Sequence, residues 1–95
     1  MPIYYVYILE TIGKNNVKRF YTGYTKNLWE RIEQHRKGIG SKFCRGKKKI
    51  ELKYFETFLK REDAMRREHE IKLLSRKEKF KLIKNFQDNE EKIGI

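Results

Sequence analysis

The sequence predicts an α+β fold, in which a three-stranded antiparallel β-sheet is flanked by about three helices in the order β-β-α-β-α-α. Two segments rich in tyrosine and β-branched residues are separated by the turn-forming residues 13–16, which is typical of a hairpin. Apolar residues at helical spacing follow the potential capping residues Asn27 and Ser75. A third alternating segment, residues 50–58, lies between the helical ones.

The hairpin begins with residues 3–9, which contain no turn former and are predicted to form a strand. Alternation divides the side chains between two faces, one with Ile3, Tyr5, Tyr7 and Leu9 and the other with Tyr4, Val6 and Ile8. Because both faces are largely apolar, we expect a central strand that is covered on both sides. Residues 18–23 are predicted to return as the second strand.

The first helix is predicted to begin after Asn27, with Glu30 placed to complete a capping box, and to end near Lys37 before two glycines. Its core face carries Leu28 and Ile32. Residues 41–49 then form a basic loop, and residues 50–58 are predicted to form a strand with Leu52 and Tyr54 on one side.

The second helix is expected from about Glu62 to Leu74, with Ala64, Ile71 and Leu74 on its core stripe. Ser75 and Glu78 resemble a capping box that opens a third helix. The apolar residues of this helix are Phe80, Leu82, Ile83 and Phe86. The chain is therefore expected to form one domain over residues 1–86, followed by a short polar C-terminal tail, 87–95, that frays.

The charge balance favours a polyanionic partner. Twenty-four Lys and Arg against thirteen Asp and Glu give a net charge of +11, which makes nucleic acid the leading partner and a membrane surface the second. A soluble protein that is merely lysine-rich is the alternative. Cys44 is the only cysteine, which excludes an intrachain disulfide and a thiolate metal cluster. With no signal peptide and no long apolar run, we expect a cytoplasmic protein.

Glu68 interrupts the apolar stripe of the second predicted helix. It stands four residues after Ala64 and three before Ile71, which places all three on one helix face. A buried lone carboxylate costs several kcal/mol unless a cation or hydrogen-bond donors compensate. Glu68 is therefore either a functional acid or the partner of a base such as Arg61 or Lys72.

Two further groups of side chains suggest a site. Arg31 and His35 are i, i+4 neighbours on the first predicted helix, where they could hold a phosphate and manage a proton. The hydroxyls of Tyr7 and Tyr21 converge if both residues lie on one face of the hairpin, and Gly23 permits a close approach. The alternatives are a solvated helix face and ordinary strand packing.

The order of these residues resembles the GIY-YIG nuclease superfamily along nearly the whole chain. Tyr5-Val6-Tyr7 and Tyr21-Thr22-Gly23 are similar to its two half-motifs, and Arg31 and Glu68 follow in the family's order. The segments YYVYIL, YTGYT, AMRREHEIK and LSRKEK most resemble the small stand-alone bacterial UPF0213 group, which is similar to the GIY-YIG domain of the nuclease Slx1. Tyr5 stands where the motif has Gly, and Val6 and Thr22 stand where it has Ile.

The resemblance implies a metal-dependent endonuclease that hydrolyses phosphodiester bonds at one concave surface. Its candidate catalytic residues are Tyr7, Tyr21, Arg31, His35 and Glu68. Glu68 would hold one Mg²⁺ or Mn²⁺, and Arg31 would neutralise charge on the phosphoryl oxygens. Tyr7 or Tyr21 would position the attacking water, with His35 as the competing base, and the sequence does not decide between them.

Phosphate contacts without base specificity are expected from the basic loop and the end of the first helix. The residues are Arg36, Lys37, Lys42, Arg45, Lys47, Lys48 and Lys49. The expected partner is nucleic acid, DNA rather than RNA, bound by a monomer without membrane contact and with a protein partner for targeting. The alternative is a non-catalytic nucleic-acid-binding or partner-recruiting module of the same fold.

Overall fold

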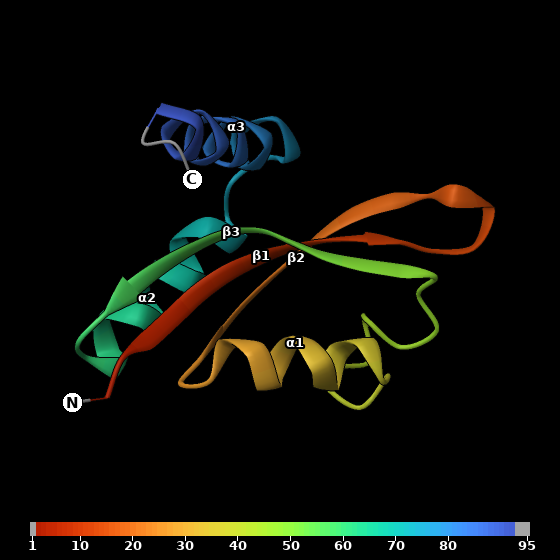
Figure 1. Ribbon diagram of the computed structural model, residues 1–95, viewed down its shortest axis with the longest axis horizontal. Helices are drawn as coiled ribbons and strands as arrows, with labels where there is room; N and C mark the ends of the chain where they lie inside the picture. Colours follow the sequence, from red (N-terminus) through yellow and green to blue (C-terminus); the bar gives the residue numbers. More distant parts are fainter. Residues whose placement is uncertain (1, 93–95) are drawn as a thin grey trace.

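The computed structural model describes residues 2–92, with side chains as far as residue 89, and has the predicted element order (Figure 1). The strands are β1 (Tyr4–Ile12), β2 (Lys18–Thr25) and β3 (Lys49–Phe58). The helices are α1 (Leu28–Arg36), α2 (Arg61–Lys72) and α3 (Arg76–Lys92), and a short 3-10 turn, η1 (Lys14–Asn16), joins β1 to β2.

The three strands form one antiparallel sheet in the order β2-β1-β3, which confirms β1 as the central strand. Alternation along β1 sends its side chains into two cores, one on each face of the sheet. On one face Tyr7 and Leu9 pack with Leu28 and Ile32 of α1. Because β2 lies at one side of the sheet, its outer edge is not covered by another strand.

The opposite face of the sheet is covered by α2 and α3. There Val6 and Ile8 pack with Ala64 and Ile71 of α2 and with Ile83 of α3. Figure 1 shows α1 and α3 on opposite sides of the sheet, which is therefore the middle layer of three.

Both predicted N-caps are confirmed, but Glu30 does not complete the predicted box, because the Asn27 backbone amide donates to Oγ1 of Thr25 at 3.1 Å and Glu30 accepts from the Asn27 side-chain amide at 2.8 Å. The Asn27 side chain accepts a hydrogen bond from the Glu30 backbone amide at 3.4 Å and begins α1. Ser75 and Glu78 form a reciprocal capping box, in which each side chain accepts from the other residue's backbone amide. These contacts involve neighbours in sequence, which is why the sequence could reveal them.

The prediction for the third strand was wrong in one respect. Tyr54 pairs with Ile8 and Leu52 with Leu9, so the register shifts by one residue between these pairs. Leu52 consequently packs on the α1 face and Tyr54 on the α2 face, although simple alternation had placed them together. An extra residue in one strand reverses the face of every side chain beyond it.

The C-terminal helix also differs from expectation. Phe80, assigned to the core of α3, is 60% exposed. The polar residues from Gln87, expected to form a tail, are helical as far as Lys92, and residues 93–95 lie outside the described part. None of the helices in residues 2–92 combines the length and apolar character that a membrane span requires.

Candidate active site

Tyr7 and Tyr21 lie on the same face of the hairpin, as their spacing predicts. Tyr7 pairs with Gly23 and Leu9 with Tyr21, and the two tyrosine rings are 6.4 Å apart. A Cβ atom at position 23 would lie 2.6 Å from the Tyr7 hydroxyl oxygen. Gly23 is therefore the residue that allows the Tyr7 side chain to cross β2.

His35 of α1 completes a buried contact between helix and hairpin. Its Nε2 atom lies 2.9 Å from the Tyr7 hydroxyl oxygen, and its ring is 5.2 Å from that of Tyr21. Both His35 and Tyr7 are almost fully buried, whereas Tyr21 is partly exposed. Gly40 closes the far side, where an added Cβ would lie 2.5 Å from Nδ1 of His35.

The environment of this pair keeps both rings neutral. Burial, together with the neighbouring Arg31 cation, lowers the pKa of His35 to about 4. Burial also raises the pKa of Tyr7 to about 12, although hydrogen bonding to Arg31 opposes that shift. Near neutral pH, neither Tyr7 nor His35 therefore carries charge.

Arg31 lies beside this pair and faces an open hollow. Its Nη1 atom donates to Oε1 of Gln34 at 3.1 Å, which fixes the direction of the guanidinium group. The hollow has a volume of about 330 Å³ and is lined by Tyr24, Thr25, Lys26, Asn27, Glu30, Arg31 and Gln34. A planar guanidinium at such a rim is suited to two phosphate oxygens.

Glu68 lies on α2, on the face of the sheet opposite to Tyr21. Arg61, at the start of α2, donates to the Tyr24 hydroxyl at 3.3 Å, and Arg76, beyond its end, lies 5.7 Å from the Phe20 ring centroid. The segment from Arg61 to Arg76 therefore runs alongside β2, and Glu68 lies midway along that segment in sequence.

The structure thus brings together four of the predicted residues, which we call the α1-face cluster: Tyr7, Tyr21, Arg31 and His35. Glu68 is not among them, because α2 covers the opposite face of the sheet, so the expectation that all five residues share one concave surface is not confirmed. On the α2 side, the residue at the middle of β2 is the polar Thr22. There the buried Thr22 hydroxyl finds no hydrogen-bond partner within residues 2–89.

An ion pair gives only a weak structural explanation for Glu68. Its side chain is 19% exposed, and its Oε1 atom lies 3.6 Å from Nζ of Lys72, which is itself half exposed. Solvent-exposed i, i+4 pairs of this kind contribute about 0.3–0.5 kcal/mol. That contribution is small beside the cost of holding a carboxylate on an apolar helix face.

The carboxylate of Glu68 suits a hard cation that takes few ligands from the protein. Within residues 2–89, no three side chains of His, Cys, Asp or Glu cluster as a metal group. A metal at Glu68 would therefore have one carboxylate, with water and phosphate oxygens as its other ligands. Mg²⁺ commonly binds in that way because it keeps several waters of its hydration shell.

The basic loop, residues 41–49, flanks the α1-face cluster. Phe43 of this loop stacks on Tyr21 with ring centroids 5.5 Å apart, and Nζ of Lys47 lies over the Phe43 ring, 4.8 Å from its centroid. The sequence predicts a role for this loop from its charges alone. Phe43 was missed because its contact with Tyr21 follows no periodic pattern.

Four of the seven predicted phosphate-binding residues line one hollow of about 410 Å³. They are Arg36, Lys47, Lys48 and Lys49. Two of these four form ion pairs, Arg36 with Glu33 at 2.9 Å and Lys49 with Glu51 at 2.6 Å. The remaining three do not line this hollow, and all are exposed: Lys37, Lys42 and Arg45.

Comparison with known proteins agrees with this architecture. The family model of the GIY-YIG catalytic domain matches residues 3–82, which is most of the chain. The chain therefore belongs to the GIY-YIG family, which is a nuclease family.

Its relatives specify the group within that family. A UPF0213 protein of Oceanobacillus iheyensis is 42% identical over 87 residues, covering 92% of this chain and 95% of that protein. A UPF0213 protein of Staphylococcus haemolyticus is 43% identical over 83 residues, covering 87% and 96%. The solution NMR structure of a UPF0213 protein from Bacillus halodurans matches with a TM-score of 0.51 and 40% identity, covering 86% of this chain and 83% of that chain. The group is UPF0213.

Proposed function

We propose that the protein is a divalent-metal-dependent endonuclease that hydrolyses phosphodiester bonds in nucleic acid, with DNA as the favoured substrate. The observation that carries the proposal is the arrangement around β2. The α1-face cluster lies on one face of the sheet at this edge strand, and the segment from Arg61 to Arg76, which carries Glu68, runs along the strand on the other face. A phosphate at the rim of β2 would be within reach of both.

Arg31 and Tyr21 are the members of the cluster that a substrate can reach. Both are partly exposed, whereas Tyr7 and His35 are buried behind them. Arg31 would neutralise the negative charge that develops on the phosphoryl oxygens. Tyr21 would contact the attacking water with its hydroxyl and hold it in line with the scissile bond.

Tyr7 and His35 would act as positioning residues. Their hydrogen bond ties α1 to the hairpin directly beneath Tyr21, so it fixes the ring that contacts water. A Tyr7 pKa near 12 and a His35 pKa near 4 place both far from the neutral range that suits a general base in the free enzyme. This argument favours Tyr21 over the two residues that the sequence left in competition with it.

Glu68 would hold one Mg²⁺ or Mn²⁺ with its carboxylate. A divalent ion bound there would supply polarisation of the phosphate and stabilisation of the leaving oxygen. The rest of the reaction depends on the chain's own groups: Arg31 binds the phosphate, Tyr21 orients water, and the basic loop holds the neighbouring phosphates.

The second candidate function is a binding module without catalysis. It is favoured by the position of Glu68, which β2 separates from the tyrosines. A nicking assay on branched and plain DNA, with Mg²⁺, Mn²⁺ or excess chelator, distinguishes the two. The nuclease proposal expects metal-dependent cleavage by the wild type. Binding of the same substrates without cleavage under every condition would support the module and overturn the nuclease.

A further inference from the structure

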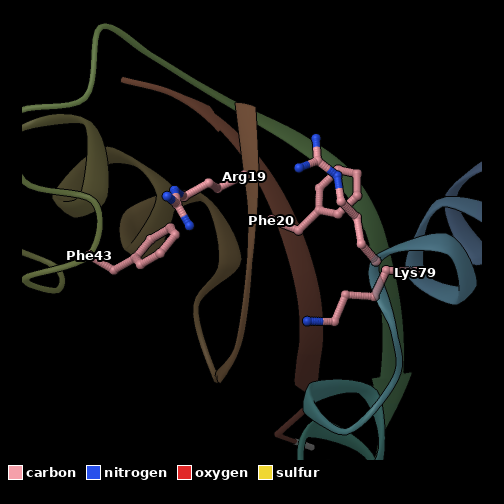
Figure 2. A pocket seen from close by; sticks show the side chains of 5 residues that line it. Arg19, Phe20, Phe43 and Lys79 are labelled. Carbon is pink, nitrogen blue, oxygen red and sulfur yellow. The ribbon is translucent and has the colours of Figure 1, made fainter. Parts of the chain in front are cut away.

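A third hollow lies along the edge of β2. It has a volume of about 200 Å³, and we call it the edge pocket; its lining residues are Arg19, Phe20, Phe43, Arg76 and Lys79. Figure 2 shows Arg19 and Phe43 on one side of the β2 ribbon and Phe20 and Lys79 on the other. The pocket therefore extends across the edge of β2.

The lining combines cations with aromatic rings and contains no carboxylate. Arg19, Arg76 and Lys79 supply three positive charges, and none of them forms an ion pair with an acidic side chain of residues 2–89. Phe20 and Phe43 add ring surface, and Phe43 is 38% exposed. Three cations without acidic partners attract an anion, and exposed ring surface favours a planar, apolar group next to it.

The edge pocket is continuous with the candidate active site. Phe43 belongs to both, because its ring stacks on Tyr21 with centroids 5.5 Å apart. Arg19 stands two residues before Tyr21 on the same face of β2, a separation of about 7 Å along the strand. A nucleic-acid strand whose phosphate lies at Arg31 and Tyr21 would reach this pocket with its neighbouring nucleotides.

We propose that the edge pocket binds one unpaired nucleotide of a single-stranded stretch of the substrate. Its phosphate would lie among Arg19, Arg76 and Lys79, and its base would lie against Phe20 and Phe43. Cationic grooves with aromatic side chains are typical of single-strand binding, because a base can stack on such a ring only when it has left its own duplex stack. The inference rests on the proposed function, because it takes the strand in the pocket to be the strand that the active site cleaves.

Binding without cleavage tests the pocket directly. The probe is a short fluorescent single-stranded DNA, compared with a blunt duplex of the same sequence, in fluorescence anisotropy titrations with chelator present. The pocket variants are Arg76→Gln/Lys79→Gln and Phe43→Leu. The matched control is Lys77→Gln/Lys84→Gln, which removes the same charge from α3 at exposed positions outside the pocket.

The pocket double variant is expected to bind the single strand roughly 10-fold more weakly, with the slope of log affinity against log salt smaller by about 1.4. Phe43→Leu should lose roughly 10-fold as well, because one stacked base is removed without a change of charge. The duplex should lose less in both variants. The control should weaken single strand and duplex equally.

Equal losses for single strand and duplex in the pocket variants, or equal losses in pocket and control variants, would overturn the proposal. Urea unfolding of each variant identifies any loss of binding that comes from misfolding. The two pocket variants change different residues, so each tests the pocket independently. The outcome is separate from the nuclease proposal. Pocket effects without metal-dependent cleavage would refute the nuclease alone, and cleavage with unchanged single-strand binding would refute the pocket alone.

Discussion

At the scale of single residues, the site depends on one missing side chain. Tyr7 can cross β2 toward His35 only because residue 23 is glycine, and an alanine Cβ there would meet the hydroxyl oxygen and two ring carbons of Tyr7 at 2.6–2.9 Å. The contact is with a buried, hydrogen-bonded ring that cannot move aside freely. The glycine of the second half-motif therefore has a packing role in addition to any role toward substrate.

Gly23→Ala is expected to lower the free energy of unfolding by about 1–3 kcal/mol, the usual cost of overpacking. The matched control is Gly13→Ala, where an added Cβ would meet only the flexible Lys47 side chain at 3.4 Å. Urea denaturation of both variants measures the difference. Equal stability of the two variants would show that the Tyr7 side chain does not lie against residue 23.

The pKa of His35 gives the protein a specific acid sensitivity. The unfolded chain binds a proton at this residue near pH 6.5, but the folded protein binds it only near pH 4. Between these values the unfolded state holds more protons, so stability falls as the pH falls. We expect the wild type to lose about 3 kcal/mol more across this range than His35→Gln.

Unfolding measured at pH 7, 6, 5 and 4 for both proteins tests this expectation. The difference between the two proteins excludes the contribution of the carboxylates to the pH dependence of stability, because the carboxylates titrate in both proteins. Parallel loss of stability in the wild type and in His35→Gln would mean that His35 is exposed to water. Such a result would also contradict the buried contact between His35 and Tyr7.

At the scale of elements, what the sequence could predict depends on how local the interaction is. Both N-caps were found because each capping side chain and the backbone amide that it binds are three residues apart. The register shift in β3 was missed because it arises from pairing with β1, and no pattern within residues 49–58 announces it. The burial of His35 was likewise hidden, since its partner Tyr7 lies 28 residues away.

The basic loop is the element that should govern general affinity. Lys47, Lys48 and Lys49 line one hollow beside the site, and reversing their charges to glutamate should weaken DNA binding and flatten its salt dependence. The matched control reverses three exposed lysines away from the loop, Lys60, Lys77 and Lys84. Anisotropy titrations at several salt concentrations compare them. An equal loss in the control would mean that only net charge matters.

At the scale of the whole molecule, the edge of β2 organises the candidate functions. The α1-face cluster, the α2 segment that carries Glu68 and the edge pocket all border this strand, although they come from elements on both faces of the sheet. The sequence predicted the five candidate catalytic residues through family resemblance and through Glu68 on its apolar stripe. It could not predict that β2 separates Glu68 from the others, because helical periodicity gives a residue's face but not the sheet face that its helix covers.

The central claim is that Glu68 is retained for chemistry at this edge. Glu68→Ala is therefore expected to lower metal-dependent cleavage on the order of 10²-fold or more while stability stays unchanged or rises. Arg31→Ala should reduce cleavage similarly. Glu70→Ala removes the same charge from an exposed position on α2 and serves as the matched control.

The most direct test measures cleavage rate and urea unfolding midpoint together for the wild type, Glu68→Ala and Glu70→Ala. The account predicts that Glu68→Ala alone loses cleavage and that it unfolds at the same urea concentration as the wild type or a higher one. A Glu68→Ala protein that unfolds, or that cleaves as fast as Glu70→Ala, would contradict it.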